Sequence, residues 1–435
     1  MNENAVIFWF RRDLRLEDNT GLWQALSSGY KVIPVFIFDT EILGKLEPDD
    51  PRVSFIFKSL NNINLKLKNV GSEIYFLHGT PEDSFKQLLS EFNVKGVYVN
   101  SDYEPYAIRR DKEIHKILES KGIPLHSFKD QVIFEKSDIV KDDGKPYTVY
   151  TPYSNRWLKN FDVKLIAEMP SESLIGNLMK LPHILSTSME SIGFRKSEIP
   201  VRNPDLNESS IAKYNLTRDI PSLEGTSLAG PHLRFGTMSI REVMRKTFSI
   251  NQVFTKELIW REFFMQILYH FPHVDGRSFR PEYDRIIWMN NEEHFEKWCA
   301  GKTGFPLVDA GMRELFQTGY MHNRVRMVAA NFLTRHLLTD WRWGEAWFAS
   351  RLLDYELSSN NGNWQWSAGT GCDAAPYFRI FNPDLQVKKF DPELKYIKKW
   401  IPELGTNDYP SPIVDHSFAR NRAIDYYKAG IKPLL

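Results

Sequence analysis

Residues 5–10 read AVIFWF, a short apolar run that is typical of a buried β-strand. Runs of the same kind follow at residues 31–38 (KVIPVFIF), 73–79 (EIYFLHG) and 94–100 (VKGVYVN), and the stretches between them carry apolar residues at helical spacing. Repetition of strand and helix predicts an α/β domain, a parallel sheet with helices on both faces. Neither GxGxxG nor GxxxxGKS/T follows the first run, which disfavours a dinucleotide or P-loop phosphate site there.

The sequence pattern changes twice further along the chain, and these changes give the expected domains. Residues 1–131 carry the α/β pattern, while residues 132–207 mix Lys, Asp, Pro and Ser with short apolar pieces and are interpreted as an interdomain connector. Long helical patterns then dominate, so we expect an all-α domain over residues 208–435. A chain of 435 residues is too long for one core of usual size, which agrees with two compact parts.

Composition is that of an ordinary globular protein. Hydrophobic residues make up 42% and charged residues 26% of the chain, which allows a large interior and disfavours disorder. The sequence has no apolar run of bilayer length and no leader with a cleavage site, so no membrane association is expected. Its two cysteines, Cys299 and Cys372, exclude a disulfide framework and favour the reducing cytoplasm. We expect both thiols to be core residues rather than metal ligands, and the protein to be a monomer.

Net charge and aromatic content point in different directions. The formal net charge is +1, whereas nucleic-acid binding usually shows as an excess of Lys and Arg, although a balanced total permits a local basic patch. Aromatic residues make up 14% of the chain, and nine of the 12 tryptophans fall at or after Trp260. A large aromatic core would explain this enrichment, and so would a site that uses indoles.

Residues 224–243 (EGTSLAGPHLRFGTMSIREV) contain two expected helix starts. Thr226 and Ser227 precede a short helix, and Ser239 with Glu242 forms a capping-box pattern for the next one. Hydroxyls and free N–H groups at helix N-termini suit a pyrophosphate. Two ordinary capped helices would give the same pattern, so this segment alone does not establish a ligand.

Residues 254–268 (FTKELIWREFFMQIL) have a face of mixed character. As a helix, the segment places on one side Phe254, Glu257, Trp260, Arg261 and Phe264. A solvated face would not carry the aromatic residues, and a core face would not carry Glu and Arg without partners. A cleft that binds a planar, polar ligand accounts for both, and an amphipathic helix with an internal Glu257/Arg261 pair is the alternative.

Residues 305–333 are expected to form two helices, the first ending near Gly319. The second helix turns one face to the core and presents on another face Asn323, Arg326 and Met327.

Residues 352–383 are expected to form a turn-rich loop. The loop carries the carboxylates of Asp354 and Glu356 and the amide of Asn360, followed by Trp364 and Trp366. Carboxyl and amide groups beside aromatic rings suit a heteroaromatic ligand with hydrogen-bonding edges.

Five stretches together resemble the photolyase/cryptochrome family, and most closely its class I cyclobutane dimer photolyases. They are FWFRRDLRLEDN (8–19), EGTSLAGPHLRFG (224–236), ELIWREFF (257–264), TGYMHNRVRM (318–327) and NNGNWQWSAGTGCDAAPYFRIFNP (360–383). The resemblance extends along nearly the whole chain, and its last motif is long and specific. It implies an N-terminal α/β domain, a helical domain that holds U-shaped FAD, and blue-light-driven electron transfer to a cyclobutane pyrimidine dimer flipped out of DNA.

The resemblance also implies roles for single residues. It implies that the following residues contact FAD: Tyr214, Thr226, Ser227, Phe254, Glu257, Arg261, Asn323, Arg326, Asp354, Glu356 and Asn360. In that set Arg326 pairs with Asp354 beside the flavin ring, and Asn360 faces the flavin N5. The dimer pocket is lined by Trp260, Trp366 and Met327, with polar contacts from Glu257, Asn323 and Arg324. Two indoles suit a flipped dinucleotide, which needs apolar walls in place of lost stacking, and a protonated Glu257 would donate to a pyrimidine carbonyl.

Three tryptophans match the family's electron relay to the flavin, namely Trp364, Trp341 and Trp288. Each alone is a plausible core residue. Three positions depart from residues common in the family, which affects local packing and redox tuning only: Phe254, Tyr320 and Glu356.

Three other functions compete with this interpretation. A (6-4) photolyase would be expected to carry a histidine pair where this chain has Asn323 and Met327. A light-signalling cryptochrome would typically have a C-terminal tail, whereas this chain ends 25 residues after WIPELGTNDYP. A generic flavin oxidoreductase would need a nicotinamide or substrate site that the sequence does not show.

A second, antenna chromophore is common in the family and binds in or beside the α/β domain. Candidate contacts are Arg52, Glu104 and Arg109. The sequence leaves open whether the antenna is of the folate or the deazaflavin or flavin type, or is absent.

Overall fold

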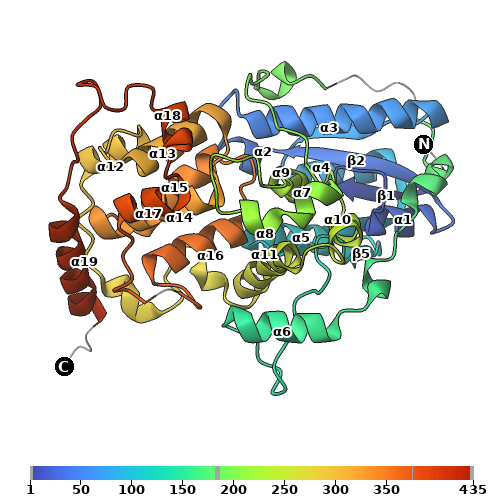
Figure 1. Cartoon of the computed structure of the whole chain (residues 1–435). Helices are drawn as coiled ribbons and strands as arrows, with labels where there is room; N and C mark the ends of the chain where they lie inside the picture. The colour runs from blue at the N-terminus through green and yellow to red at the C-terminus, as the bar shows by residue number, and fades with distance from the viewer. Residues whose placement is uncertain (1–2, 182–186, 375, 432–435) are drawn as a thin grey trace. The chain divides into compact units, whose positions relative to one another are not determined.

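The computed structural model describes residues 3–181, 187–374 and 376–431 (Figure 1). The chain divides into two compact units. Unit 1 contains Met1–Asp138, Leu158–Leu206 and Leu228–Ser249, and unit 2 contains Ile139–Trp157, Asn207–Ser227 and Ile250–Leu435. These bounds differ from the expected domains, because most of the expected connector and a helical segment after it pack within unit 1. Residues 182–186 of that connector lie outside the described residues.

Unit 1 is built on a five-stranded sheet in the order β3-β2-β1-β4-β5. The strands are β1 (Asn4–Phe10), β2 (Lys31–Asp39), β3 (Tyr75–Gly79), β4 (Asn93–Asn100) and β5 (Leu125–Phe128). Every neighbouring pair is parallel, so the α/β prediction for this part is confirmed. The four predicted strands are present, and β5 is an additional edge strand.

Both faces of this sheet are covered by helices. Alternate residues of β1 enter two separate hydrophobic clusters, Val6 and Phe8 in one and Ile7 and Trp9 in the other. The first cluster includes residues of α1 (Thr20–Leu26) and α3 (Pro51–Leu67), and the second includes residues of α4 (Pro81–Glu91) and α5 (Pro105–Glu119). Side chains alternate across a strand, so a run that is apolar throughout needs cover on both sides.

The motif at residues 8–19 packs against a segment more than 200 residues later. The N–H of Leu14 donates to the carbonyl of Phe235 at 3.1 Å. Gly236 has a φ of 64°, and a Cβ there would lie 2.1 Å from the carbonyl oxygen of Arg12, so only glycine fits this junction. Arg241 binds the buried carboxylates of Asp18 and Asp130 at 2.9 and 2.8 Å. These contacts give both motifs a structural role within unit 1, which also contains α9 (Gly230–Phe235) and α10 (Ile240–Thr247).

Unit 2 is helical, as predicted. Its helices are α7 (Glu208–Ala212), α8 (Tyr214–Thr217), α11 (Gln252–His270), α12 (Glu292–Cys299), α13 (Pro306–Thr318), α14 (Asn323–Asn331), α15 (Trp341–Arg351), α16 (Leu357–Ala368), α17 (Pro383–Phe390), α18 (Lys395–Trp400) and α19 (His416–Ile431).

The boundary between the units falls within α6 (Tyr150–Asn160), and α2 (Thr40–Leu43) lies in unit 1. Short 3-10 turns lie at Lys68–Val70, Val163–Ile166, Ser171–Asn177, Glu190–Ile192, Pro272–Val274 and Pro281–Arg285, and a π-helical turn at Phe332–His336 follows α14. Across the described ranges, no helix is both long and apolar enough to cross a membrane.

Two sequence predictions meet different outcomes in unit 2. Helix α13 ends at Thr318 with Gly319 in the left-handed region at φ 69°, as expected. The turn-rich loop predicted for residues 352–383 is wrong over residues 357–368, which form α16. Asn and Gly favour turns, but tertiary packing overrides that preference. A Cβ at Gly362 would lie 2.1 Å from Cδ1 of Phe264, so α16 packs closely on α11 because this residue has no side chain.

Candidate active site

Unit 2 contains a cavity of about 290 Å³ bounded by α11, α14 and α16. Ten residues line it: Arg218, Glu257, Trp260, Arg261, Phe264, Asn323, Met327, Ser359, Asn363 and Trp366. Five of the six residues predicted for the dimer pocket are among them, and the sixth, Arg324, is not. Arg218, Ser359 and Asn363 were missed as site residues.

Trp260 forms one wall of the cavity, and its orientation is fixed from behind. Asn251 caps the start of helix α11, and its side chain accepts from the N–H of Val253 at 2.9 Å. The Trp260 ring stacks on Tyr150 with 3.5 Å between ring centroids and 5° between planes. The Tyr150 hydroxyl donates to the carbonyl of Lys256 at 2.8 Å, which holds the ring in place. No pattern in the sequence pointed to Tyr150, because the pair spans 110 positions.

Glu257 is the carboxylate of the cavity, and it forms an ion pair with Arg218. Burial raises the pKa of Glu257, and the Arg218 guanidinium lowers it without cancelling that effect. Arg218 directly follows α8, and its guanidinium also lies 5.4 Å from the centroid of the Tyr214 ring. The carboxylate and the cation that controls its charge therefore both face the same space.

Helix α14 contributes an amide and a thioether to the cavity through Asn323 and Met327, one turn apart. Arg324, between them, binds Asp219 at 2.6 Å and lies 4.4 Å from the Phe390 ring. Arg326 forms the predicted ion pair with Asp354 through two hydrogen bonds of 3.1 and 2.9 Å. Paired contacts of this kind fix both geometry and charge.

Helix α16 presents Trp366 to the cavity and holds Asn360 on another face. The amide nitrogen of Asn360 donates to Oε1 of Glu345 at 2.8 Å and to the Glu345 backbone carbonyl at 3.1 Å. Burial raises the pKa of Glu345 to about 7, while the hydrogen bond from Asn360 lowers it. Glu345 was missed, since a single Glu within a helix carries no distinctive spacing.

Two family models match this chain. One described as DNA photolyase matches residues 6–172, and one described as the FAD binding domain of DNA photolyase matches residues 254–408. A deoxyribodipyrimidine photo-lyase of Synechococcus is 35% identical over 96% of this chain and 95% of its own length. The chain belongs to the photolyase/cryptochrome family.

Solved structures of the photolyase/cryptochrome family share its fold over nearly the full length. A class III photolyase from Agrobacterium tumefaciens has a TM-score of 0.86 and 34% identity, covering 100% of this chain and 99% of its own. A Sulfolobus tokodaii photolyase with two FAD molecules has a TM-score of 0.81 and 36% identity, covering 98% and 100%. A Synechocystis cryptochrome has a TM-score of 0.84 and 25% identity, covering 98% and 99%. The comparisons therefore support the family rather than one class within it.

The family's FAD-binding domain includes most of the cavity wall, and the groups present suit FAD. The rings of Tyr214 and Phe254 meet edge to face at 5.1 Å, and Arg261 lies 3.5 Å from a carboxylate oxygen of Glu356. Guanidinium and hydroxyl groups suit phosphates, and amide and carboxylate groups suit flavin ring edges. The half-buried hydroxyls of Thr226 and Ser227 also belong to unit 2, whereas Ser239 belongs to unit 1. The contacts of each of these residues with FAD remain predictions.

The three tryptophans of the predicted relay belong to one hydrophobic cluster of unit 2. Trp364 and Trp341 are fully buried and Trp288 is half-buried. A Cβ at Gly344 would lie 2.1 Å from Trp364, so α15 packs directly on that indole, one turn after Trp341. One half-buried ring and two buried rings agree with an inward relay, and the relay itself remains a prediction. Trp298, 6.1 Å from Trp364, is a fourth indole that the sequence did not single out.

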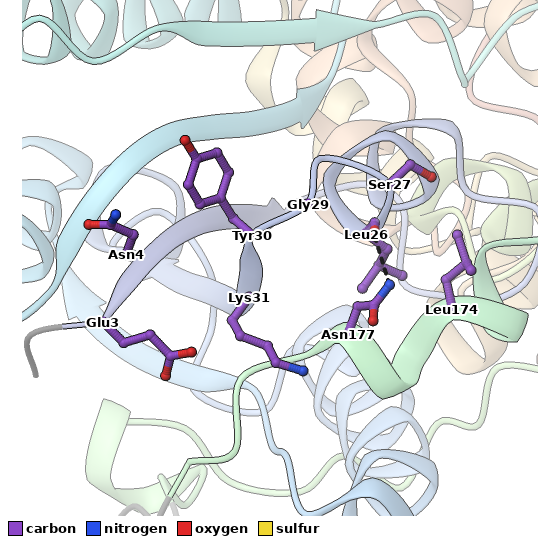
Figure 2. Close-up of a pocket in the computed structure, with 9 residues that line it drawn as sticks. All are labelled: Glu3, Asn4, Leu26, Ser27, Gly29, Tyr30, Lys31, Leu174 and Asn177. Carbon is purple, nitrogen blue, oxygen red and sulfur yellow. Dashed lines mark hydrogen bonds between the residues drawn. The ribbon is translucent and has the colours of Figure 1, made fainter.

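The antenna candidates in unit 1 are engaged with other residues. Arg52 forms an ion pair with Asp50, Glu104 binds Arg234 at 2.8 Å, and Arg109 lies 5.9 Å from the Tyr106 ring. The hollow of about 450 Å³ in this unit lies elsewhere, at the amino ends of β1 and β2 (Figure 2). Ligands of parallel sheets usually bind beyond the opposite, carboxyl ends. The hollow therefore does not favour an antenna site, and the three contacts remain predictions.

Proposed function

We propose that this protein splits cyclobutane pyrimidine dimers in DNA by light-driven electron transfer. The observation that carries the proposal is the cavity in which Trp260 and Trp366 form indole walls beside Glu257 and Asn323. A dinucleotide flipped out of a duplex loses its stacking partners and needs such walls. When bound and reduced, FAD supplies the excited electron and takes it back, so the reaction has no net redox change.

The chain's own residues bind, orient and shield the dimer. Trp260 is held by Tyr150 and offers a preset stacking surface. Glu257 and the Asn323 amide are the polar groups aimed at the pyrimidine edges. Hydrogen bonds to a carbonyl stabilise negative charge that develops on it, provided that the carboxyl group is protonated. Met327 fills space without competing for hydrogen bonds.

Repair of the (6-4) lesion is disfavoured by the same cavity. Acid-base work on that lesion calls for an imidazole, and none of the described residues that line the cavity is a histidine. His322, next to Asn323, uses Nδ1 to accept from the N–H of Arg324 at 3.2 Å. Burial and the nearby arginines lower its pKa to about 4, so it stays neutral at physiological pH.

Two oligonucleotides test the proposal, one with a cyclobutane thymine dimer and one with a (6-4) lesion. FAD-loaded, reduced protein is illuminated with each, and the products are separated by chromatography, with dark samples as controls. We expect light-dependent restoration of the first substrate only. Restoration of the second would support a (6-4) photolyase, and restoration of neither would support a cryptochrome-type photoreceptor.

A further inference from the structure

The ion pair between Arg218 and Glu257 poses a chemical problem for substrate binding. An ionised carboxylate only accepts hydrogen bonds, and so does a pyrimidine carbonyl. With Glu257 paired to Arg218, the cavity offers the carbonyl an anion. The pairing seen in the structure therefore favours the opposite charge state of Glu257 from the one that would stabilise a dimer.

Arg218 is the cation that favours the ionised form of Glu257. Burial raises the pKa of Glu257, Arg218 opposes this through charge and a hydrogen bond, and Asp219 raises it further. Other charged groups around the cavity are already paired. Arg261, one turn along α11, lies 3.5 Å from Glu356, and Arg324 of α14 binds Asp219 at 2.6 Å. The neighbours from α16 are uncharged, namely Ser359, Asn363 and Trp366, and Tyr150 contributes a phenol.

The position of Arg218 also allows its side chain to separate from Glu257. Its side chain lines the cavity and the residue directly follows the short helix α8, whereas Glu257 is anchored on the long helix α11, and the two side chains are 22% and 33% exposed. A flipped dinucleotide brings its phosphates to the cavity rim. Guanidinium groups bind phosphate through paired hydrogen bonds, and a phosphate oxyanion competes well with a carboxylate that can be neutralised by a proton.

We propose that Arg218 is a positioning residue that couples DNA binding to protonation of Glu257. Arg218 transfers from the Glu257 carboxylate to a DNA phosphate, and Glu257 takes up one proton from solvent. The neutral carboxyl group then donates its hydrogen to the pyrimidine carbonyl. No bond other than this O–H forms, and no electron is exchanged. The inference rests on the proposed function and names the regulation of the same site.

Proton uptake on DNA binding tests the switch directly. FAD-loaded protein is titrated in the dark with an oligonucleotide containing a thymine dimer, in calorimetry buffers that differ in ionisation enthalpy. At pH values where free Glu257 is ionised, uptake is expected to reach about one proton per oligonucleotide bound, and to be much smaller for undamaged DNA. Glu257→Gln should abolish this uptake.

Arg218→Gln should reduce the uptake, because loss of the guanidinium raises the pKa of Glu257 further and leaves less of the carboxylate to be protonated when DNA binds. The slope of log affinity for DNA against log salt concentration should decrease in magnitude by about one, because one phosphate contact is lost. Arg313→Gln is the matched control, since Arg313 forms an ion pair with Glu403 at 2.7 Å outside the cavity, and its uptake should equal that of the unaltered protein. If Arg218→Gln does not load FAD, Arg218→Lys replaces it and should keep part of the uptake.

The result that overturns the switch is dimer binding by the unaltered protein without proton uptake at any pH, or undiminished uptake in Arg218→Gln. Repair of dimers is measured on the same preparations. Absence of light-dependent repair refutes the proposed function, whereas repair without proton uptake refutes the switch alone.

Discussion

Glu345 is one of the side chains whose charge should change the stability of unit 2 with pH. Its carboxyl group is half-buried on α15, and burial raises its pKa from 4.5 to about 7. In the unfolded chain the group ionises near its ordinary value. Between these two values the unfolded chain loses a proton that the folded protein keeps, so stability falls as pH rises. The loss begins near pH 4.5 and is complete above about pH 7.

The size of this effect follows from the shift. One pKa unit corresponds to about 1.4 kcal/mol, so the shift of Glu345 costs about 3 kcal/mol of unfolding free energy at pH 8. Glu345→Gln removes the charge and keeps an oxygen that can accept from Asn360. At each pH, the unfolding free energy of the unaltered protein is subtracted from that of the variant. We expect this difference to be larger at pH 8 than at pH 4.5 by up to about 3 kcal/mol.

Urea denaturation at both pH values, followed by circular dichroism on FAD-loaded protein, measures this double difference. Comparing the two pH values cancels any cost of the substitution that does not depend on charge. Glu293→Gln is the control, because Glu293 is exposed and binds Lys297 at 2.6 Å, and its double difference should be near zero. An equal effect of Glu345→Gln at both pH values would refute the assignment of a raised pKa to this group.

Three further substitutions test the site and the packing that supports it. Trp260→Ala should weaken binding to dimer-containing DNA by about 1–3 kcal/mol while FAD stays bound, because one stacking wall is lost, and unchanged affinity in a titration would remove Trp260 from the pocket. Trp341→Phe should slow light-driven reduction of oxidised FAD, followed by absorption, while chemically reduced protein still repairs. Trp343→Phe, on the same helix but outside the predicted relay, should photoreduce normally, and failure of reduced Trp341→Phe to repair would give Trp341 another role. Gly362→Ala should lower the unfolding free energy by about 1–3 kcal/mol, because its Cβ would lie 2.1 Å from Phe264, and an unchanged urea midpoint would contradict this.

The sequence predicted the elements whose pattern is local. The run at residues 5–10 is apolar at every position and became a central strand covered on both faces. The spacing of Glu257, Trp260 and Arg261 placed them correctly on one face of α11, where all three line the cavity. Periodicity suffices for these, because each depends only on neighbours within a turn or a strand.

Long-range pairs escaped prediction for a physical reason. Tyr150 supports Trp260 from 110 positions away, and Arg218 meets Glu257 from 39 positions away. Neither spacing follows from any helical or strand period. The division of unit 1 into separate stretches depends likewise on contacts such as that between Leu14 and Phe235. Helix α16 was missed because its Asn, Ser and Gly residues favour turns, while its stability comes from packing on α11.

Asn360 shows how such hidden partners decide what a predicted residue can do. Its amide nitrogen has two hydrogens, and both Glu345 acceptors use them. A backbone carbonyl can only accept, so the nitrogen must face Glu345 and the amide oxygen must face the other way.

If Asn360 faces the flavin N5, as the family resemblance predicts, it offers an acceptor there and favours a ring that carries a hydrogen on N5. Ionisation of Glu345 would polarise the amide and strengthen that acceptor. Protonation of the flavin at N5 should therefore vary with pH around pH 7, because Glu345 acts on it through Asn360. Glu345→Gln should remove that dependence.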